Sequence, residues 1–372
     1  MQSKCRQSGY TLIELLVSMA IGLFLMSGVI TVMLDTKVNF LMSEEISYIQ
    51  ESARFAMDEL SYDIRMAGYM GCNSEGELSN TLNDNSWPYL SRGLIGFEQG
   101  DAGIPTEFKN DVSAGTDVLI INRGDPVNKA IVESHNPPAA TIHLTDVADF
   151  KTGEILVIAS ANCEQMAIFQ RSGPNSSNSK QIVHNTGNSV SPGNCHKALS
   201  RPVSDGYAAY DCSSAPGPSD KGYEYPPGST IMRFSSNAYF VKKSPATGLL
   251  SLFKQTLTVS GGSAKTVARE VTSGIEDLEV IYGVDKGNSP DNVVDQYYSA
   301  VSITDVKADA GNGYVGWDRV IAVRITMVLR SARVSFPKNT LVNLGDGDIF
   351  NDRYMRQKVS STIKIRNRVE GA

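Results

Sequence analysis

The chain has 372 residues, of which 41% are hydrophobic and 20% are charged. These proportions are typical of a protein with an apolar core and exclude wholesale disorder. The formal net charge of −6 argues against general binding to a nucleic-acid backbone, which requires clustered lysine and arginine.

The chain begins with a short basic leader, MQSKCRQSG, which contains Lys4 and Arg6 and no acidic residue. An apolar run follows from Tyr10 to Leu34, with Glu14 as its only charge. As a helix, this run would be roughly 37 Å long, enough to span the hydrocarbon core of a membrane. By the positive-inside rule, the leader stays in the cytoplasm and the chain beyond Leu34 lies outside.

Two ordinary interpretations of the apolar run leave something unexplained. A cleaved secretory signal needs small residues at a cleavage site after the run, and LDTK at residues 34–37 provides none. A plain signal anchor fits the length, but it leaves the carboxylate of Glu14 in the membrane without a partner. That costs about 2–3 kcal/mol.

Residues 9–16, GYTLIELL, resemble the class III signal of type IV prepilins and type II secretion pseudopilins. The resemblance implies that a prepilin peptidase cuts between Gly9 and Tyr10 and N-methylates Tyr10, so that the apolar helix stays on the mature protein. It also implies that Glu14 meets the N-terminal amine of a neighbouring subunit and sets the register of the filament. The family usually has phenylalanine where this chain has Tyr10, a conservative difference in shape.

After the apolar run, the pattern becomes amphipathic and predicts that the helix continues as a stem. Acidic residues such as Glu45 and Glu59 are expected on the outer faces. The predicted inner stripe comprises Val38, Leu41, Ile49, Ala53, Ala56, Leu60, Ile64 and Ala67.

A separate coiled-coil stalk would need a continuous heptad repeat of apolar residues, and this repeat is only partly present. We therefore expect one helix from Tyr10 to about Ala67, with Gly68 as its terminator. Its segment 10–34 would cross the membrane and later lie in the filament core, and the stem 35–67 would present one stripe to a β domain.

Beyond Gly68, short alternating or apolar runs are separated by Gly, Pro, Asn and Ser. This sequence pattern predicts an α+β fold, in which the long N-terminal helix packs on a mostly antiparallel β-sheet domain. A hairpin turn is predicted at residues 259–263. The predicted strands are residues 116–122, 154–160, 165–170, 230–234, 238–242, 249–255, 278–282, 319–329 and 360–366.

Residues 171–229 are rich in Ser, Asn, Gly and Pro and contain few apolar residues. We expect a connector here, between a first β-rich lobe at 68–170 and a second at 230–372. The alternative is a displayed loop that contacts a partner through its tyrosines. Those tyrosines are Tyr207, Tyr210, Tyr223 and Tyr225.

One of the five cysteines, Cys5, lies in the leader, which leaves an even number on the exported side. An even number fits two disulfides in an oxidising compartment, with three possible pairings. A zinc site that includes His196 is the alternative, but the spacing contains no CxxC pair. The candidate cysteines are Cys72, Cys163, Cys195 and Cys212.

No pattern in the sequence indicates catalysis or a cofactor. The four histidines form no HxxxH pair, and there is no nucleophile elbow, no phosphate-binding loop and no GxGxxG loop placed after a strand. Asp346, Asp348 and Asp352 lie close together, but they lack the order of an EF-hand loop. We expect an ordinary acidic turn there, with calcium binding as the open alternative.

Residues 50–72, which end in RMAGYMGC, resemble the stem of the PilW family of minor pilins, and residues 318–325 and 365–368 resemble its C-terminal part. The resemblance implies a non-enzymatic minor pilin of the type IV pilus. It would act with other minor pilins and the major pilin in a complex that primes assembly, counters retraction and supports a large tip adhesin. It would reside in the inner membrane and then in the pilus, at or near the tip, with roles in adhesion and twitching motility.

Three alternatives stay open. A J-type pseudopilin of type II secretion is usually shorter than this chain. A pilus receptor that binds DNA or a surface ligand is disfavoured by the acidic charge. A membrane-anchored enzyme would need catalytic residues that the sequence does not offer.

Overall fold

A computed structural model gives the structure of most of the chain. The predicted cleavage residues Gly9 and Tyr10 lie outside the described residues, as do Tyr207 and Tyr210. The described residues are 11–72, 77–83, 90, 92–101, 103–109, 111–176, 178–187, 189–200, 212, 222–286, 291–303 and 316–368.

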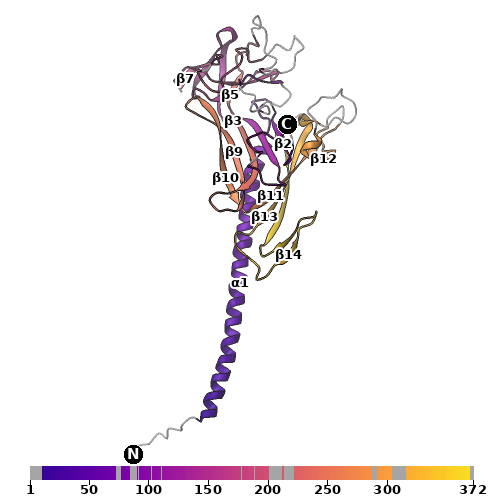
Figure 1. Ribbon diagram of the computed structural model, residues 1–372. Coiled ribbons are helices and arrows are strands. Elements are labelled where there is room, and N and C mark those ends of the chain that lie inside the picture. The colour runs from indigo at the N-terminus through magenta and orange to yellow at the C-terminus, as the bar shows by residue number, and fades with distance from the viewer. Residues whose placement is uncertain are drawn as a thin grey trace, which may run out of the picture. The chain divides into compact units, whose positions relative to one another are not determined.

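The chain forms two compact units. One comprises Met1–Glu51 with Ser331–Arg356, and the other comprises Ser52–Arg330 with Gln357–Ala372. The long helix α1 (Leu12–Arg65) begins in the first unit and ends in the second (Figure 1).

In the first unit, the apolar residues of α1 from Leu12 to Leu34 are exposed around the whole helix. Among the described residues, α1 is the one helix long and apolar enough to cross a membrane. The stem positions Val38 and Leu41, expected on the inner stripe, are also exposed in this unit. The predicted stripe therefore begins later than expected.

A second segment of the first unit, Ser331–Arg356, contains the hairpin of β14 (Thr340–Asn343) and β15 (Ile349–Asp352). Arg333 attaches this segment to α1. Its backbone N–H donates to Oε2 of Glu45 at 3.2 Å, and its guanidinium pairs with Glu44 at 3.3 Å. Glu45 is therefore buried, although the sequence placed it on an outer face.

The second unit contains the end of α1 and two sheets, which confirms the α+β prediction. The larger sheet has the order β1-β6-β5-β8-β3-β4-β7, with β9 and β10 added beside β8 and β2 added beside β3. The smaller sheet has the order β12-β11-β13-β16. The pairings are antiparallel except for the parallel pair of β1 and β6.

The strands of this unit are β1 (Glu77–Asn80), β2 (Leu94–Phe97), β3 (Val118–Asn136), β4 (Thr141–Asp149), β5 (Ile155–Ala159), β6 (Gln165–Gln170), β7 (Asn178–Val183), β8 (Thr230–Lys243), β9 (Leu250–Ser260), β10 (Ser263–Ser273), β11 (Ile275–Val284), β12 (Gln296–Tyr298), β13 (Val320–Arg330) and β16 (Arg356–Lys364). Short 3-10 helices are η1 (Pro137–Ala139), η4 (Ala300–Ser302), η5 (Trp317–Arg319) and η6 (Arg366–Arg368).

Every predicted strand overlaps an observed one, and two of them, at 230–234 and 238–242, form the single strand β8. The predicted hairpin turn is present between β9 and β10. Gly261 and Gly262 have φ values of +63° and +80° there, the left-handed conformations that a two-residue turn of a hairpin favours.

The central strands β5 and β6 are buried along their whole length. Leu156 and Ile158 of β5 pack into one apolar cluster, whereas Ile155 and Val157 pack into another on the opposite face. Both faces of these strands are therefore covered. This explains why their sequences are continuously apolar rather than alternating.

The larger sheet contains strands from both sides of the expected connector, and β7 lies within the connector and pairs with β4. The boundary between two lobes stays a prediction. Tyr225 is fully buried, so the suggestion that it contacts a partner at the surface is wrong.

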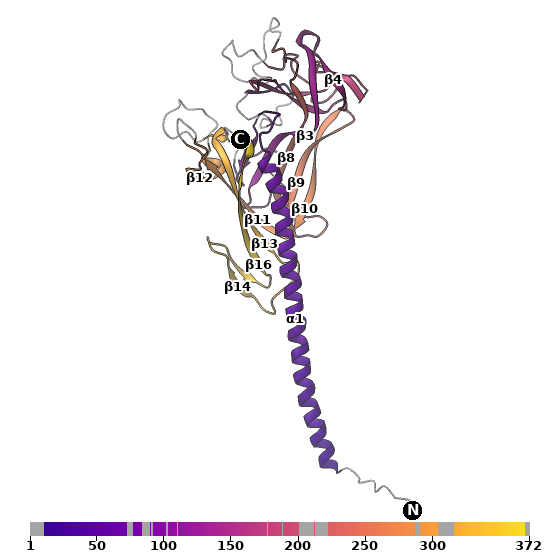
Figure 2. The same cartoon turned by 180° about the vertical axis from the view of Figure 1, so that it is seen from behind.

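The end of α1 lies between the two sheets in both views (Figure 1, Figure 2). Ala56, Leu60 and Ile64 are completely buried on its inner face. The chain then turns at Gly68, whose φ of +74° is a left-handed conformation that glycine adopts without strain. A Cβ atom on Gly93 would lie 2.4 Å from the Cα atom of Gly68, so the two backbones meet where no side chain fits.

Asp117, which immediately precedes β3, links the two sheets. Its backbone N–H donates to the carbonyl of Leu278 at 2.9 Å, and its carboxylate accepts the N–H of Val280 at 2.8 Å, both in β11. Burial raises the pKa of the Asp117 carboxyl to about 7, with a further contribution from nearby carboxylates such as Glu98.

We expect Asp117→Asn to stabilise the protein at neutral pH, because asparagine keeps an acceptor for Val280 without a charge. The folded pKa of about 7 lies above the ordinary value of 3.8, so the contribution of Asp117 to the free energy of unfolding should fall as pH rises from about 4 to about 7. Unfolding in urea should show a gain of roughly 1–2 kcal/mol for the variant at pH 7.5 and a smaller gain at pH 4.

The matched control is Asp111→Asn, which changes an exposed aspartate that pairs with Lys242. It should alter the free energy of unfolding by less than about 1 kcal/mol. An equal effect of both substitutions, or a gain for Asp117→Asn that does not grow between pH 4 and pH 7.5, would contradict the assignment.

Candidate functional site

The predicted register residue Glu14 lies in the first turn of α1, where it forms a capping box with Thr11. Its Oε2 atom accepts hydrogen bonds from the backbone N–H of Thr11 at 2.9 Å and from the Thr11 hydroxyl at 3.0 Å. The Thr11 hydroxyl in turn accepts the backbone N–H of Glu14 at 3.4 Å. The carboxylate thus satisfies an N-terminal donor of the helix and lies at the positive end of the helix dipole.

This geometry shows what Glu14 can do in a single subunit. The side chain is held beside the start of the helix, one residue from the position where a new N-terminus at Tyr10 would begin. The cap engages Oε2 only, so Oε1 is available to a second donor.

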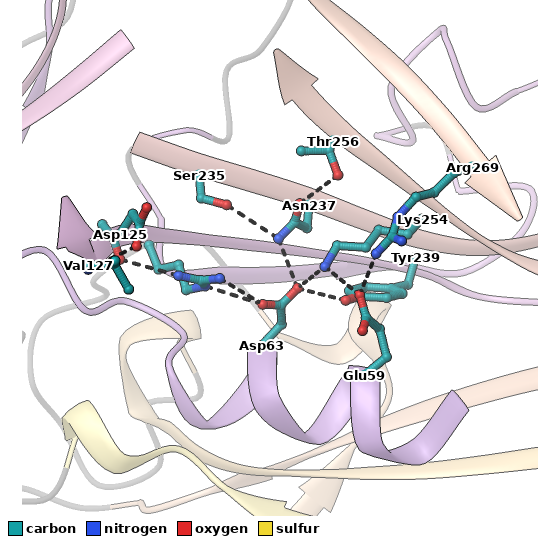
Figure 3. A network of polar contacts seen from close by, with 12 residues as sticks. Glu59, Asp63, Asp125, Val127, Ser235, Asn237, Tyr239, Lys254, Thr256 and Arg269 are labelled. Atoms are coloured by element: carbon teal, nitrogen blue, oxygen red, sulfur yellow. Dashed lines mark hydrogen bonds and ion pairs between the residues drawn. The ribbon is translucent and has the colours of Figure 1, made fainter. Parts of the chain in front are cut away.

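The other end of α1 carries a buried acidic residue, Asp63, which has almost no exposed surface (Figure 3). Arg123 of β3 pairs with Oδ1 at 3.2 Å, and Lys254 of β9 pairs with Oδ2 at 2.8 Å. Asn237 and Tyr239 of β8 donate to Oδ2 at 2.8 Å and 2.6 Å. Three strands therefore converge on one carboxylate of the helix.

The cations decide the protonation state of Asp63. Burial alone would raise its pKa, but hydrogen bonds from Lys254 and Tyr239 and the charges of Lys254 and Arg123 outweigh burial and hold the pKa below its ordinary value. Asp63 is therefore ionised at neutral pH. Burial raises the pKa of the Tyr239 hydroxyl, and the Asp63 carboxylate raises it further. The hydroxyl therefore stays protonated and remains a donor.

Glu59 lies one turn before Asp63 and extends the network toward solvent. Lys254 bridges the two carboxylates, with Nζ 2.9 Å from Oε1 of Glu59, and Arg269 of β10 contacts the same oxygen at 2.8 Å (Figure 3). The prediction that Glu59 faces outward is therefore wrong. Asp63 was missed because its cations lie 60 and 191 residues away in the chain.

The four candidate cysteines form two disulfides, which confirms the prediction and supplies the pairing. Cys72, just after α1, is joined to Cys163 in the turn between β5 and β6, and Cys195 is joined to Cys212. Because all four are oxidised, none is a thiolate that could bind zinc.

The acidic turn does not assemble a cation site with its neighbours. Asp352 forms a bidentate pair with Arg356 at 2.7 Å and 2.8 Å, and it accepts the N–H of Tyr354. In the part of the chain that the structure describes, no three His, Cys, Asp or Glu side chains are grouped so as to hold a metal ion.

Two family models match the chain. Residues 4–30 match the prokaryotic N-terminal methylation motif, and residues 238–367 match the type IV pilus-assembly protein W. No curated protein and no solved structure matches it. Together with the exposed apolar helix, the motif shows a membrane-anchored, pilin-like protein.

The Asp63 network yields a stability prediction. Asp63→Asn should lower the free energy of unfolding by about 3 kcal/mol or more, because Lys254 and Arg123 would lose the charge that compensates them. Arg269→Gln should cost less than about 1 kcal/mol, because Arg269 is largely exposed. Urea unfolding of the full chain in detergent, followed by circular dichroism, measures both.

A double-mutant cycle isolates the pairing. Lys254→Met combined with Asp63→Asn should cost less than the sum of the two single changes, because each single change leaves a buried charge with less compensation. Strict additivity would contradict a direct interaction.

Proposed function

Since this chain belongs to the PilW family of type IV pilus-assembly proteins, we propose that it is a minor pilin. It acts in a complex of minor pilins that primes assembly of the pilus and supports display of a tip adhesin. The observation that carries the proposal is the pairing of a methylation motif at one end of the chain with an assembly-protein match at the other.

The size of the exported part supports a minor rather than a major role. The β-rich unit extends from Ser52 to the C-terminal segment and contains a ten-stranded and a four-stranded sheet. A domain of this bulk does not fit at every position of a thin filament, whereas a subunit present in a few copies at the tip has no such restriction.

The structure of α1 supports a membrane-to-filament route. The prepilin peptidase would cut between Gly9 and Tyr10 at the cytoplasmic face and N-methylate Tyr10. The exposed apolar surface of Leu12–Leu34 would lie first in the inner membrane and then among the helices of the other pilins. The rest of the chain would lie in the periplasm and later in the pilus.

Glu14 would set the register of this subunit. Its carboxylate is costly in lipid, and the Thr11 cap satisfies one of its two oxygens. The N-terminal amine of the neighbouring pilin would supply the charge that the cap lacks, so correct axial placement would be the state in which the acid is fully compensated.

We expect Glu14→Ala to be cleaved normally but not incorporated into pili. Glu14→Gln separates the two roles of this residue, because glutamine keeps an acceptor for Thr11 and lacks the charge. Immunoblots of membranes and of sheared pili measure cleavage and incorporation.

If charge sets the register, both variants should be depleted from the sheared fraction by about tenfold or more, the effect of losing roughly 1.4 kcal/mol. Incorporation of Glu14→Gln at the wild-type level would show that the cap alone matters and would overturn the register role.

The priming role predicts the phenotype of a gene deletion. Surface piliation should fall, and it should partly recover when pilus retraction is also blocked, because slow unprimed assembly would no longer be reversed. Electron microscopy and quantification of sheared pilin measure both strains. Full piliation of the single deletion would rule out priming.

A further inference from the structure

Two of the four histidines form a buried pair in the second unit. His135, near the end of β3, and His184, just after β7, approach each other with their Nε2 atoms 3.2 Å apart. Both rings are buried and contact aromatic neighbours, Tyr225 beside His135 and Phe169 beside His184. Neither family model covers this part of the chain.

The hydrogen bonds determine which nitrogens carry protons. The backbone N–H of Tyr225 donates to Nδ1 of His135 at 3.2 Å, so that nitrogen is unprotonated. Neutral His135 therefore carries its proton on Nε2 and donates it to Nε2 of His184. His184 in turn carries its proton on Nδ1, which has no hydrogen-bond partner on another residue that the structure describes.

Each neutral ring carries one N–H proton, and this chain of hydrogen bonds has no place for a third ring proton. Protonation of His135 places an N–H at Nδ1, opposite the N–H of Tyr225. Protonation of His184 places an N–H at Nε2, opposite the N–H of His135. If His135 changes tautomer to accept that proton, its Nδ1 again opposes Tyr225. One added proton therefore always breaks one of the two hydrogen bonds.

The surroundings oppose an added charge. Burial lowers the pKa of His135 to about 4, and burial together with the neighbouring His135 and Lys197 holds the pKa of His184 well below its ordinary value. Neither ring pairs with a carboxylate among the described residues. Glu224 lines a surface groove with His135 and the exposed His143, and it is itself exposed. Glu133 of β3 is also exposed.

Tyr225 is fully buried in an apolar cluster with Leu199 and Ile231, and hydrogen bonds fix its segment to the chain around it. Its hydroxyl bonds to that of Ser200 at 2.7 Å, and Tyr223 donates its N–H to the Ser200 carbonyl at 2.6 Å. Beyond the bond from Tyr225 to His135, the chain pairs with β3 again at Gly228 and Ser229, which bond to Val132. The groove beside His135 gives protons a path to the ring.

We propose that His135 and His184 form an acid-released latch that holds residues 222–225 on the larger sheet and lets them go when either ring is protonated. Above about pH 6.5 the latch is closed, since both rings are neutral in the folded and unfolded forms alike. As pH falls from 6.5 toward 4, the released form binds protons that the closed form does not. Release is therefore favoured by up to about tenfold per pH unit for each histidine.

Hydrogen exchange of the full chain in detergent tests the latch. The protection factor of the Tyr225 amide, corrected for intrinsic exchange, should fall at least tenfold between pH 6.5 and 4.5. The protection factor of the Val157 amide, in the middle of β5, should stay unchanged. An equal fall at both amides would mean that acid unfolds the whole unit, and no fall at Tyr225 would mean that the pair does not open; either result overturns the proposal.

Variants assign the effect to the rings. His135→Asn places a non-titrating oxygen where Nδ1 lies, so the Tyr225 amide should stay protected at pH 4.5. His143→Gln removes an exposed histidine of the same groove and should leave the wild-type fall unchanged. A pH-dependent fall that persists in His135→Asn would overturn the latch.

Ring ¹⁵N chemical shifts of the wild type provide a measurement that needs no variant. At pH 7 they should show a protonated Nε2 and an unprotonated Nδ1 on His135. The reverse tautomer would contradict the arrangement.

Discussion

The carboxylate of Asp63 is stable at the buried face of α1 only because Arg123 and Lys254 reach it from different strands. The small apolar residues around it, such as Ala56, would tolerate rotation of the helix or a shift along its axis. The charge of Asp63 does not tolerate either movement, because each would separate the buried carboxylate from the two cations that compensate it. The network therefore selects one orientation for the end of α1. The strands β3, β8 and β9 that supply Arg123, Asn237, Tyr239 and Lys254 are thereby tied to one face of the helix.

The sequence predicted the elements whose residues interact locally or repeat regularly. The apolar run and the stem were evident from spacing, and β5, β6 and β13 from runs of buried apolar residues. Glu14 was evident because one charge stood among apolar neighbours. In contrast, β7 reads as part of a polar loop, since Ile182 is its only fully buried residue and its pairing with β4 holds it in place. Secondary structure that depends on a distant partner leaves no signal in its own residues.

The same reason explains the sites that were missed. On an amphipathic helix, an acid such as Asp63 or Glu59 is normally expected to face solvent, and nothing nearby in the chain marks the cations that draw it inward. His135 and His184 are 49 residues apart. No short motif marks either histidine, because their hydrogen bond forms only where β3 approaches the end of β7.

The bond between Cys72 and Cys163 affects how this protein bears load. In a pilin that is pulled through its helix, tension on α1 would first meet the contacts of Asp63 with the strands and then follow the chain to Cys72. The disulfide passes that tension directly to the turn after β5, across a sequence separation of 91 residues. The intervening chain would otherwise extend by roughly 300 Å if it unravelled. While the disulfide is intact, that length stays withheld even where contacts of α1 with the sheet, such as that of Asp63 with Arg123 of β3, are broken.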